Sequence, residues 1–211
     1  ETIARLYAGG ELFLHIGVTL YETVLGFVLG TAAGTLIAIT LWWSPAINRV
    51  LDPYLVVLNA LPKIALGPIL IVWFGAGITS IIVMALLISF VVTIMSVLAG
   101  FNEITGEKQL LMKTLGASKL QIFTMVVLPA SLPTIMNALK ISVGMSWVGV
   151  IVGEYLVSKA GLGYLIVYGG QVFKLDLVMA SIVVLCLLAA LMYYGVAYME
   201  KKLVKWRMHG G

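Results

Sequence analysis

The residues of this sequence that could act on a solute are polar side chains set inside long apolar segments. Lys63 follows Pro62 directly, and Asn59 lies about one helical turn earlier. An ionisable side chain within a membrane segment is costly and by default indicates function, and broken helices are tolerated where they line a cavity or are buried in protein. We expect Lys63 either to line a path and attract an anionic or polar solute, or to have a structural role by snorkelling or pairing.

Other kinds of chemistry have no support in the sequence. No nucleophile–base pair or paired carboxylates appear, so we expect no catalytic residue and no enzyme activity. His15 and His209 are isolated from each other and from the single cysteine, which argues against a metal site. No G-x-x-x-x-G-K-[ST] phosphate loop occurs. If ATP and magnesium are used, another polypeptide must bind them, and this chain is expected to hold no cofactor.

The composition indicates a membrane protein. The 211 residues are 62% hydrophobic and only 10% charged, with a mean hydropathy of +1.11, whereas soluble domains are about 45–50% apolar and about 25% charged. We therefore expect one transmembrane domain over residues 1–211. The single cysteine, Cys186, lies in an apolar run and predicts packing only.

Five segments are long and apolar enough to cross a bilayer, which takes about 20 residues. They cover residues 14–42, 54–74, 78–100, 134–157 and 176–199, and they lack the period-two alternation of transmembrane strands. The sequence thus predicts an all-α bundle of about five spans. Gly26, Gly30 and Gly34 form small-xxx-small pairs that allow close helix packing.

The distribution of lysine and arginine predicts the orientation, because cytoplasmic loops are enriched in these residues. One side of the membrane is expected to hold three segments, namely connections 43–53 and 101–133 and the tail after residue 199. The other side holds Arg5, Lys159 and Lys174. We expect the first side to be cytoplasmic and the basic tail to rest against the lipid bilayer. The basic residues of that side are Arg49, Lys108, Lys113, Lys119, Lys201, Lys202, Lys205 and Arg207.

Segment 101–133 has an ordered pattern of turn residues. Residues 103–115 have the pattern of a short amphipathic helix, and Gly116 stands where a helix end needs a left-handed residue. Ser118 and Gln121 form a capping box that opens a second helix, which Pro129 and Pro133 are expected to end or kink. So many ordering signals together favour a rigid surface for a partner over a passive hairpin.

The same segment resembles the cytoplasmic EAA motif of ABC importer permeases, which reads E-A-A, three residues, G, nine residues, I-x-L-P. Gly116 and Leu128-Pro129 are in place and Val126 replaces the isoleucine, while Leu110, Leu111 and Met112 replace E-A-A. Segments 52–77 and 151–166 are similar to the nitrate/sulfonate/taurine branch, which includes importers of pyrimidine vitamin precursors. The likeness runs from about Gly10 to Trp206.

The resemblance implies the type I importer permease fold, with one more N-terminal span expected before residue 1, in the bacterial inner membrane. It implies a homodimer, two cytoplasmic ATPase subunits docked on residues 103–121, an external solute-binding protein, and no nucleic-acid partner. The residues expected to couple to the ATPase are Leu111, Met112, Lys113, Leu115, Gly116, Ala117, Ser118, Lys119, Gln121, Leu128 and Pro129.

The resemblance also extends the expected translocation path. Glu154, near the external end of the fourth span, is either a solvated carboxylate or a gate or brace for the re-entrant segment 160–168. Ser142 and Ser146 share one helix face, which in a dimeric permease could line the path with Trp147 stacking on a flat solute. Serines in spans equally allow close packing.

A stand-alone secondary transporter or channel is the alternative function. It would predict inverted repeats and buried carboxylates that bind coupling ions. No repeat is evident, and Asp52 and Asp176 are expected at span ends. A membrane-embedded enzyme is disfavoured because no reactive group of residues is present. The substrate is expected to be a small polar or anionic solute.

Overall fold

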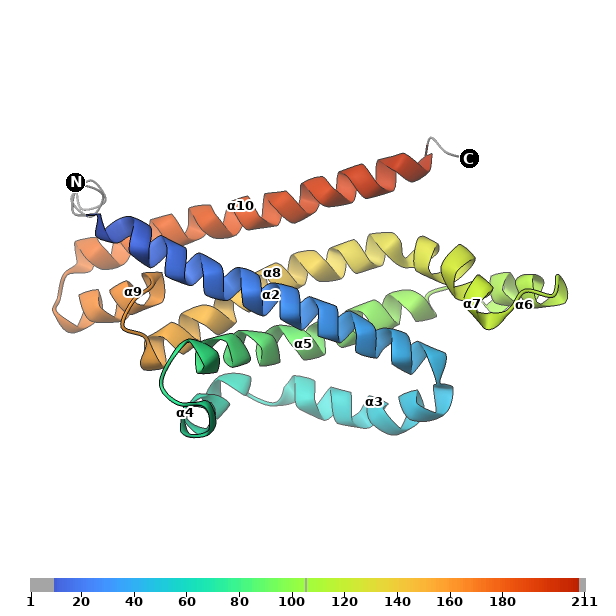
Figure 1. Cartoon of the computed structure of the whole chain (residues 1–211), viewed down its shortest axis with the longest axis horizontal. Coiled ribbons are helices and arrows are strands. Elements are labelled where there is room, and N and C mark those ends of the chain that lie inside the picture. The colour runs from blue at the N-terminus through green and yellow to red at the C-terminus, as the bar shows by residue number, and fades with distance from the viewer. Residues whose placement is uncertain (1–9, 105, 209–211) are drawn as a thin grey trace.

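The computed structural model describes residues 10–104 and 106–208, and this part of the chain is helical with no strand (Figure 1). Among these described residues, four helices are long and apolar enough to span a membrane, and a bent helix pair makes a fifth span if it is counted as one. The predicted bundle of about five spans is confirmed. In chain order the elements are α2 (Glu11–Trp43), α3 (Pro45–Ala60), a 3-10 turn (Lys63–Leu66), α4 (Gly67–Phe74), α5 (Ile78–Asn102), α6 (Gly106–Thr114), α7 (Lys119–Ile122), a π turn (Phe123–Val127), α8 (Leu128–Val157), α9 (Leu162–Gln171) and α10 (Leu175–Met208).

Helix α5 forms the centre of the bundle. It packs along both α2 and α8, and it is the most buried of the spanning helices. Helix α10 lies outside, against α8 and α9, and is the least buried. The layer of α3 and α4 makes fewer contacts with α5 and leaves many apolar side chains exposed.

Small residues make the close contacts with α5, as the small-xxx-small pattern predicts. Gly26, Gly30 and Gly34 of α2 all face α5, and a Cβ on Gly30 would collide with the Ser89 hydroxyl. On the other side of α5, a Cβ on Gly149 of α8 would collide with the backbone of Ala85. The absence of these side chains therefore sets the distance between the three helices.

The second span was expected over residues 54–74 with its helix broken near Pro62; the structure confirms the break but starts the span earlier. Helix α3 already begins at Pro45, so the expected connection 43–53 is mostly helical. Ser44 accepts a hydrogen bond from the Ile47 N–H, and proline suits the first helical position. Asp52 therefore lies within α3 and not at a span end.

The second span is bent. The helices of residues 45–60 and 63–74 meet at 84°. Gly67-Pro68 begins α4, where proline is tolerated.

The prolines of segment 101–133 also act differently from the prediction. Neither Pro129 nor Pro133 ends the helix, because residues 119–157 form one continuous span. The π turn, Phe123–Val127, is separated from Pro129 by a single residue. A π turn inserts an extra residue into the hydrogen-bond ladder, so the chain can accommodate the lost proline donor without stopping.

The two ends of the bundle carry different elements (Figure 1). Helices α6 and α7 lie at the same end as the C-terminal end of α10. Helix α9 and the start of α2 lie at the opposite end. The segments that the lysine and arginine distribution groups together therefore do share one end.

Candidate functional site

Helices α6 and α7 form a hydrogen-bonded helix–turn–helix at one end of the bundle (Figure 1). Gly116 adopts the left-handed conformation, with φ +81°, and its N–H donates to the Lys113 carbonyl at 3.0 Å. The Ser118 hydroxyl accepts from the Gln121 N–H at 3.3 Å, and the Gln121 side chain accepts from the Ser118 N–H at 2.7 Å. The predicted glycine turn and capping box are both confirmed.

One face of this helix–turn–helix is anchored to the bundle. Met112, Ala117 and Leu128 pack against a core cluster that includes Phe101 and Phe123. The surface of α6, the turn and α7 that the bundle leaves uncovered carries four exposed leucines, which we call the leucine face. Its exposed leucines are Leu110 (62% exposed), Leu111 (61%), Leu115 (74%) and Leu120 (59%).

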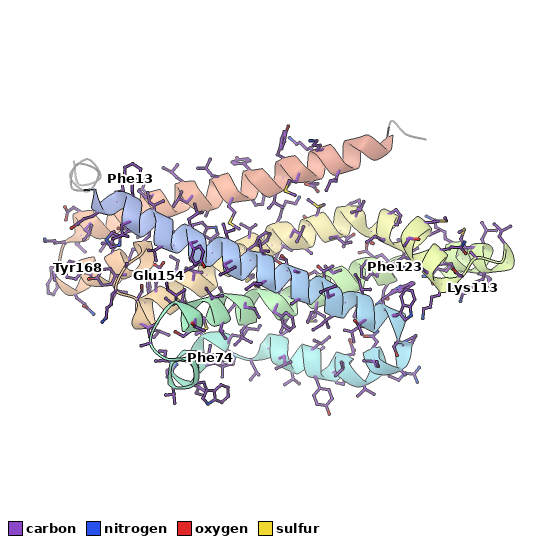
Figure 2. All side chains as sticks on the ribbon, viewed as in Figure 1. Phe13, Phe74, Lys113, Phe123, Glu154 and Tyr168 are labelled. Carbon is purple, nitrogen blue, oxygen red and sulfur yellow. The ribbon has the colours of Figure 1, made fainter. Side chains whose placement is uncertain are left out.

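Lys119 ties α7 to the end of α2. Its ammonium group donates to the Trp43 carbonyl and lies 5.7 Å and 5.5 Å from the ring centroids of Trp42 and Trp43. A cation at a helix C-terminus and over aromatic rings is favourable. Lys113, by contrast, is exposed at the far end of the molecule (Figure 2). The predicted coupling residues therefore gather in one substructure, with Pro129 at the start of α8.

Asn59, Pro62 and Lys63 lie together at the bend between α3 and α4. The Lys63 ammonium donates to the Asn59 carbonyl at 3.2 Å, so it caps the end of α3. Asn59 and Pro62 are exposed and Lys63 is partly exposed. This geometry gives Lys63 a structural bond and leaves it on the outer face of the chain, where contact with a solute stays a prediction.

The expected path residues of α8 are buried within the chain. The Ser142 hydroxyl shares a 2.7 Å hydrogen bond with Thr93 of α5. Ser146 is fully buried, and Trp147 is only 4% exposed, packed near Val143 and Val196. The chain therefore does not present the open ring face that we expected for stacking. Contact of these residues with solute stays a prediction.

Glu154 belongs to a buried polar network at the α9 end of the bundle (Figure 2). Its two carboxylate oxygens accept from the Thr19 hydroxyl, at 2.6 Å, and from the Gly163 N–H. Only 1% of Glu154 is exposed, so it is not a solvated helix-end carboxylate. These bonds are those of a brace, and a role in gating stays a prediction.

The network satisfies the first N–H groups of α9, which have no partner within their own helix. His15 Nδ1 accepts from the Gly161 N–H at 2.9 Å, and the Thr19 hydroxyl accepts from the Leu162 N–H at 2.7 Å. Side chains of α2 and α8 thus hold the start of α9. With ten residues, α9 is too short to cross a membrane.

Sequence reasoning missed Glu22 as part of this site. It is fully buried in α2, its carboxyl group interacts with that of Glu154, and neither oxygen has a well-formed hydrogen bond to the described residues. An acidic residue inside an apolar span was the signal that could have found it. Elsewhere in the bundle, Lys140 of α8 forms a 2.9 Å ion pair with Glu200 of α10.

Comparison with known proteins shows what kind of protein carries these features. Residues 26–205 match the family described as the binding-protein-dependent transport system inner membrane component. The chain belongs to this family. It is a multi-pass permease of the ABC importer type, in the nitrate/sulfonate/taurine branch.

Several curated permeases are similar over nearly the whole chain. The putative aliphatic sulfonates transport permease protein SsuC of Bacillus subtilis is 32% identical over 98% of this chain and 75% of its own length. The taurine transport system permease protein TauC of Escherichia coli is 30% identical over 97% and 74%. The formylaminopyrimidine transport permease protein ThiX of Halalkalibacterium halodurans is 31% identical over 92% and 78%.

A solved structure has the same fold. A chain of the inward-facing MetNI methionine ABC transporter superposes with a TM-score of 0.74 at 20% identity, covering 96% of this permease and 98% of that chain. The predicted type I importer permease fold is therefore confirmed.

Proposed function

We propose that this permease is the membrane subunit of an ATP-driven importer and provides the path for a small polar or anionic solute. Two copies would form a homodimer in the bacterial inner membrane. A cytoplasmic ATPase would dock on the α6–α7 end of each copy, and an external binding protein would deliver the solute at the α9 end. ATP and magnesium would be bound by the ATPases.

The observation that carries this proposal is the open leucine face on a rigid helix–turn–helix. Helices α6 and α7 lie at the end of the bundle, beyond the spanning part of α5 (Figure 1). Four leucines of α6, the turn and α7 are each more than half exposed, namely Leu110, Leu111, Leu115 and Leu120. Exposed apolar side chains gathered beside polar ones mark interaction sites. Since Gly116 and the Ser118–Gln121 cap hold this face rigid, force applied to it would reach the start of α8 and drive alternating access.

The basic residues support a location of the leucine face on the cytoplasmic side of the membrane. Lys108, Lys113 and Lys119 lie at this end, as does the C-terminal end of α10, which carries Lys201 and Lys202. A surplus of lysine and arginine favours the cytoplasmic side, where ATP is available. In this orientation α9, with its Glu154 brace, would lie on the external side.

The substrate class is inferred from the relatives. The three named permeases serve sulfonates, taurine and formylaminopyrimidine, all small and polar. The path would follow the layer of α3 and α4, where Tyr54 and Trp73 are exposed and Lys63 marks the bend. A second copy packed on this layer would cover it.

Reconstitution tests the function. The permease would be purified with its co-expressed ATPase and placed in vesicles with the binding protein, and uptake of taurine, an alkanesulfonate or formylaminopyrimidine would be measured with and without ATP. We expect uptake only with ATP and the ATPase. Lys113→Glu combined with Gly116→Pro should abolish it while the folded bundle persists.

The matched control lies in the same helix. Lys108→Glu combined with Gly106→Pro makes the same changes at the start of α6, where proline is tolerated and a larger residue meets open space. This variant should retain most of the ATP-coupled uptake. Equal loss in both double variants would show that the Gly116 turn has no special role.

A stand-alone transporter is the second candidate, and one observation favours it: Glu22 and Glu154 are buried carboxyl groups inside spanning helices. Such groups can serve coupling ions. Glu154 however lies near the α9 end of the bundle and is already bonded to Thr19 and Gly163. Uptake that continued in vesicles without any ATPase subunit would establish this alternative and overturn our proposal.

A further inference from the structure

A cavity of about 410 Å³ opens between the coupling helices and the ends of the spans. Leu41 and Trp42 of α2 and Ile122 of α7 supply apolar walls. Helices α3, α5 and α6 complete it with polar side chains. Its volume lies in the range of small-molecule sites, and no residue expected to line the translocation path borders it.

The polar lining carries positive charge and no acidic group. Two lysines, Lys113 and Lys119, and three amide residues, Asn48, Asn102 and Gln109, line the cavity. Lys119 uses one donor on the Trp43 carbonyl, and an ammonium group has three. Lys113 has no ion-pair partner among the described residues. Donors from both lysines are therefore available to an anion.

One residue that lines the cavity has a buried acceptor atom without a hydrogen-bond donor. Asn48 Oδ1 is buried, and no described residue donates a hydrogen bond to it. A buried polar atom left without a partner is destabilising. A ligand that combines an anionic group with a hydroxyl or ammonium donor would complement both the lysines and this oxygen.

The position of the cavity identifies the source of such a ligand. Trp42 and Trp43 end the spanning helix α2, and Lys119 lies over both rings. Tryptophan and lysine at the end of a span lie at the level of the lipid headgroups. The apolar wall of Leu41 and Ile122 would lie toward the acyl chains and the lysines toward the phosphate.

We propose that this cavity binds the phosphate of a phospholipid whose headgroup carries a donor, such as phosphatidylglycerol or phosphatidylethanolamine. Lys113 and Lys119 hold the phosphate, and the headgroup hydroxyl or ammonium donates to Asn48. The bound lipid bridges α3 and α6, so it joins the second span to the coupling helices. The site is independent of which solute the permease moves.

The test measures binding of short-chain lipids to the purified full-length permease in detergent, by thermal shift and by microscale thermophoresis. Dihexanoyl phosphatidylglycerol and phosphatidylethanolamine should bind tighter than dihexanoyl phosphatidylcholine, whose headgroup has no donor. Lys113→Gln should weaken binding of the first two about tenfold, as expected for loss of one charge-assisted hydrogen bond. Asn48→Leu should remove the preference over phosphatidylcholine.

Lys108→Gln is the matched control, because Lys108 lies in the same helix but does not line the cavity. It should change the affinity less than twofold. Equal weakening by Lys108→Gln and Lys113→Gln would indicate unspecific attraction and overturn the proposal, as would equal affinity for all three lipids. Binding of glycerol phosphate or inorganic phosphate as tightly as the lipids would identify a soluble ligand and also overturn it.

Discussion

Thr19 and Glu154, 135 positions apart in the sequence, are joined by a 2.6 Å hydrogen bond inside the bundle. The same Thr19 hydroxyl accepts from the Leu162 N–H, so one side chain of α2 links α8 to the start of α9. Because both partners are buried, loss of this hydroxyl leaves a buried acceptor and a buried donor without a bond.

Thr19→Val should therefore destabilise the α9 end. We expect a loss of about 1–3 kcal/mol in the free energy of unfolding, measured as a lower melting temperature in detergent, and faster proteolysis within residues 158–175. Thr31→Val is the control, since Thr31 bonds to the Phe27 carbonyl of its own helix. If both variants melted alike, the hydroxyl of Thr19 would not brace α9.

Glu22 and Glu154 should respond differently to the same substitution. Glu154 accepts two hydrogen bonds through its two oxygens, and glutamine would put an NH₂ group against one donor. Glu22 accepts none from the described residues, and two interacting buried carboxyl groups cannot both be ionised. Glu22→Gln should therefore keep the melting temperature, whereas Glu154→Gln should lower it. The reverse ranking would show that Glu22 carries the charge.

The contact of α8 with α5 depends on a missing side chain at Gly149. Gly149→Ala would push a Cβ into the Ala85 backbone, and such overpacking costs about 1–3 kcal/mol. Gly144→Ala in the same helix meets open space and should be neutral or stabilise by up to about 1 kcal/mol. Thermal unfolding of the two variants compares them directly. If the two variants had similar melting temperatures, α5 and α8 could move apart without a loss of stability.

Local chemistry explains what the sequence could predict. Gly116 and the Ser118–Gln121 pair act within a few residues, so their roles can be read from spacing. The glycines of α2 were predictable for the same reason, since four-residue spacing places them on one helix face.

The failures have equally specific causes. Pro62 signals a break in the second span, but neither this proline nor the hydropathy of residues 61–66 reports the 84° angle of the bend. The π turn before Pro129 depends on packing of Phe123 and Val127 in the core, which proline rules do not contain. Glu22 meets Glu154 only through the packing of α2 on α8, and spacing within one segment cannot report such a pair.

The Gly116 turn should be sensitive to any side chain. At φ +81° a Cβ costs roughly 1–2 kcal/mol in a left-handed residue, although there is open space around it. Gly116→Val should therefore loosen α6 relative to α7 without collapsing the bundle. We expect lower ATP-coupled uptake with a nearly unchanged melting temperature. Gly106→Val, in open space without a positive φ, is the control and should keep its uptake.

The leucine face should carry most of the affinity for the ATPase. Leu111 and Leu115 are 61% and 74% exposed, and truncating an apolar side chain at the centre of an interface costs about 1–2 kcal/mol or more. Leu111→Ala with Leu115→Ala should weaken binding of the purified ATPase about tenfold or more. Leu175→Ala is the control, because Leu175 is 68% exposed at the opposite end of the bundle. The binding is measured by pull-down of the ATPase with each permease variant in detergent. If the double variant and the Leu175→Ala control retained equal amounts of ATPase, the docking surface would lie elsewhere.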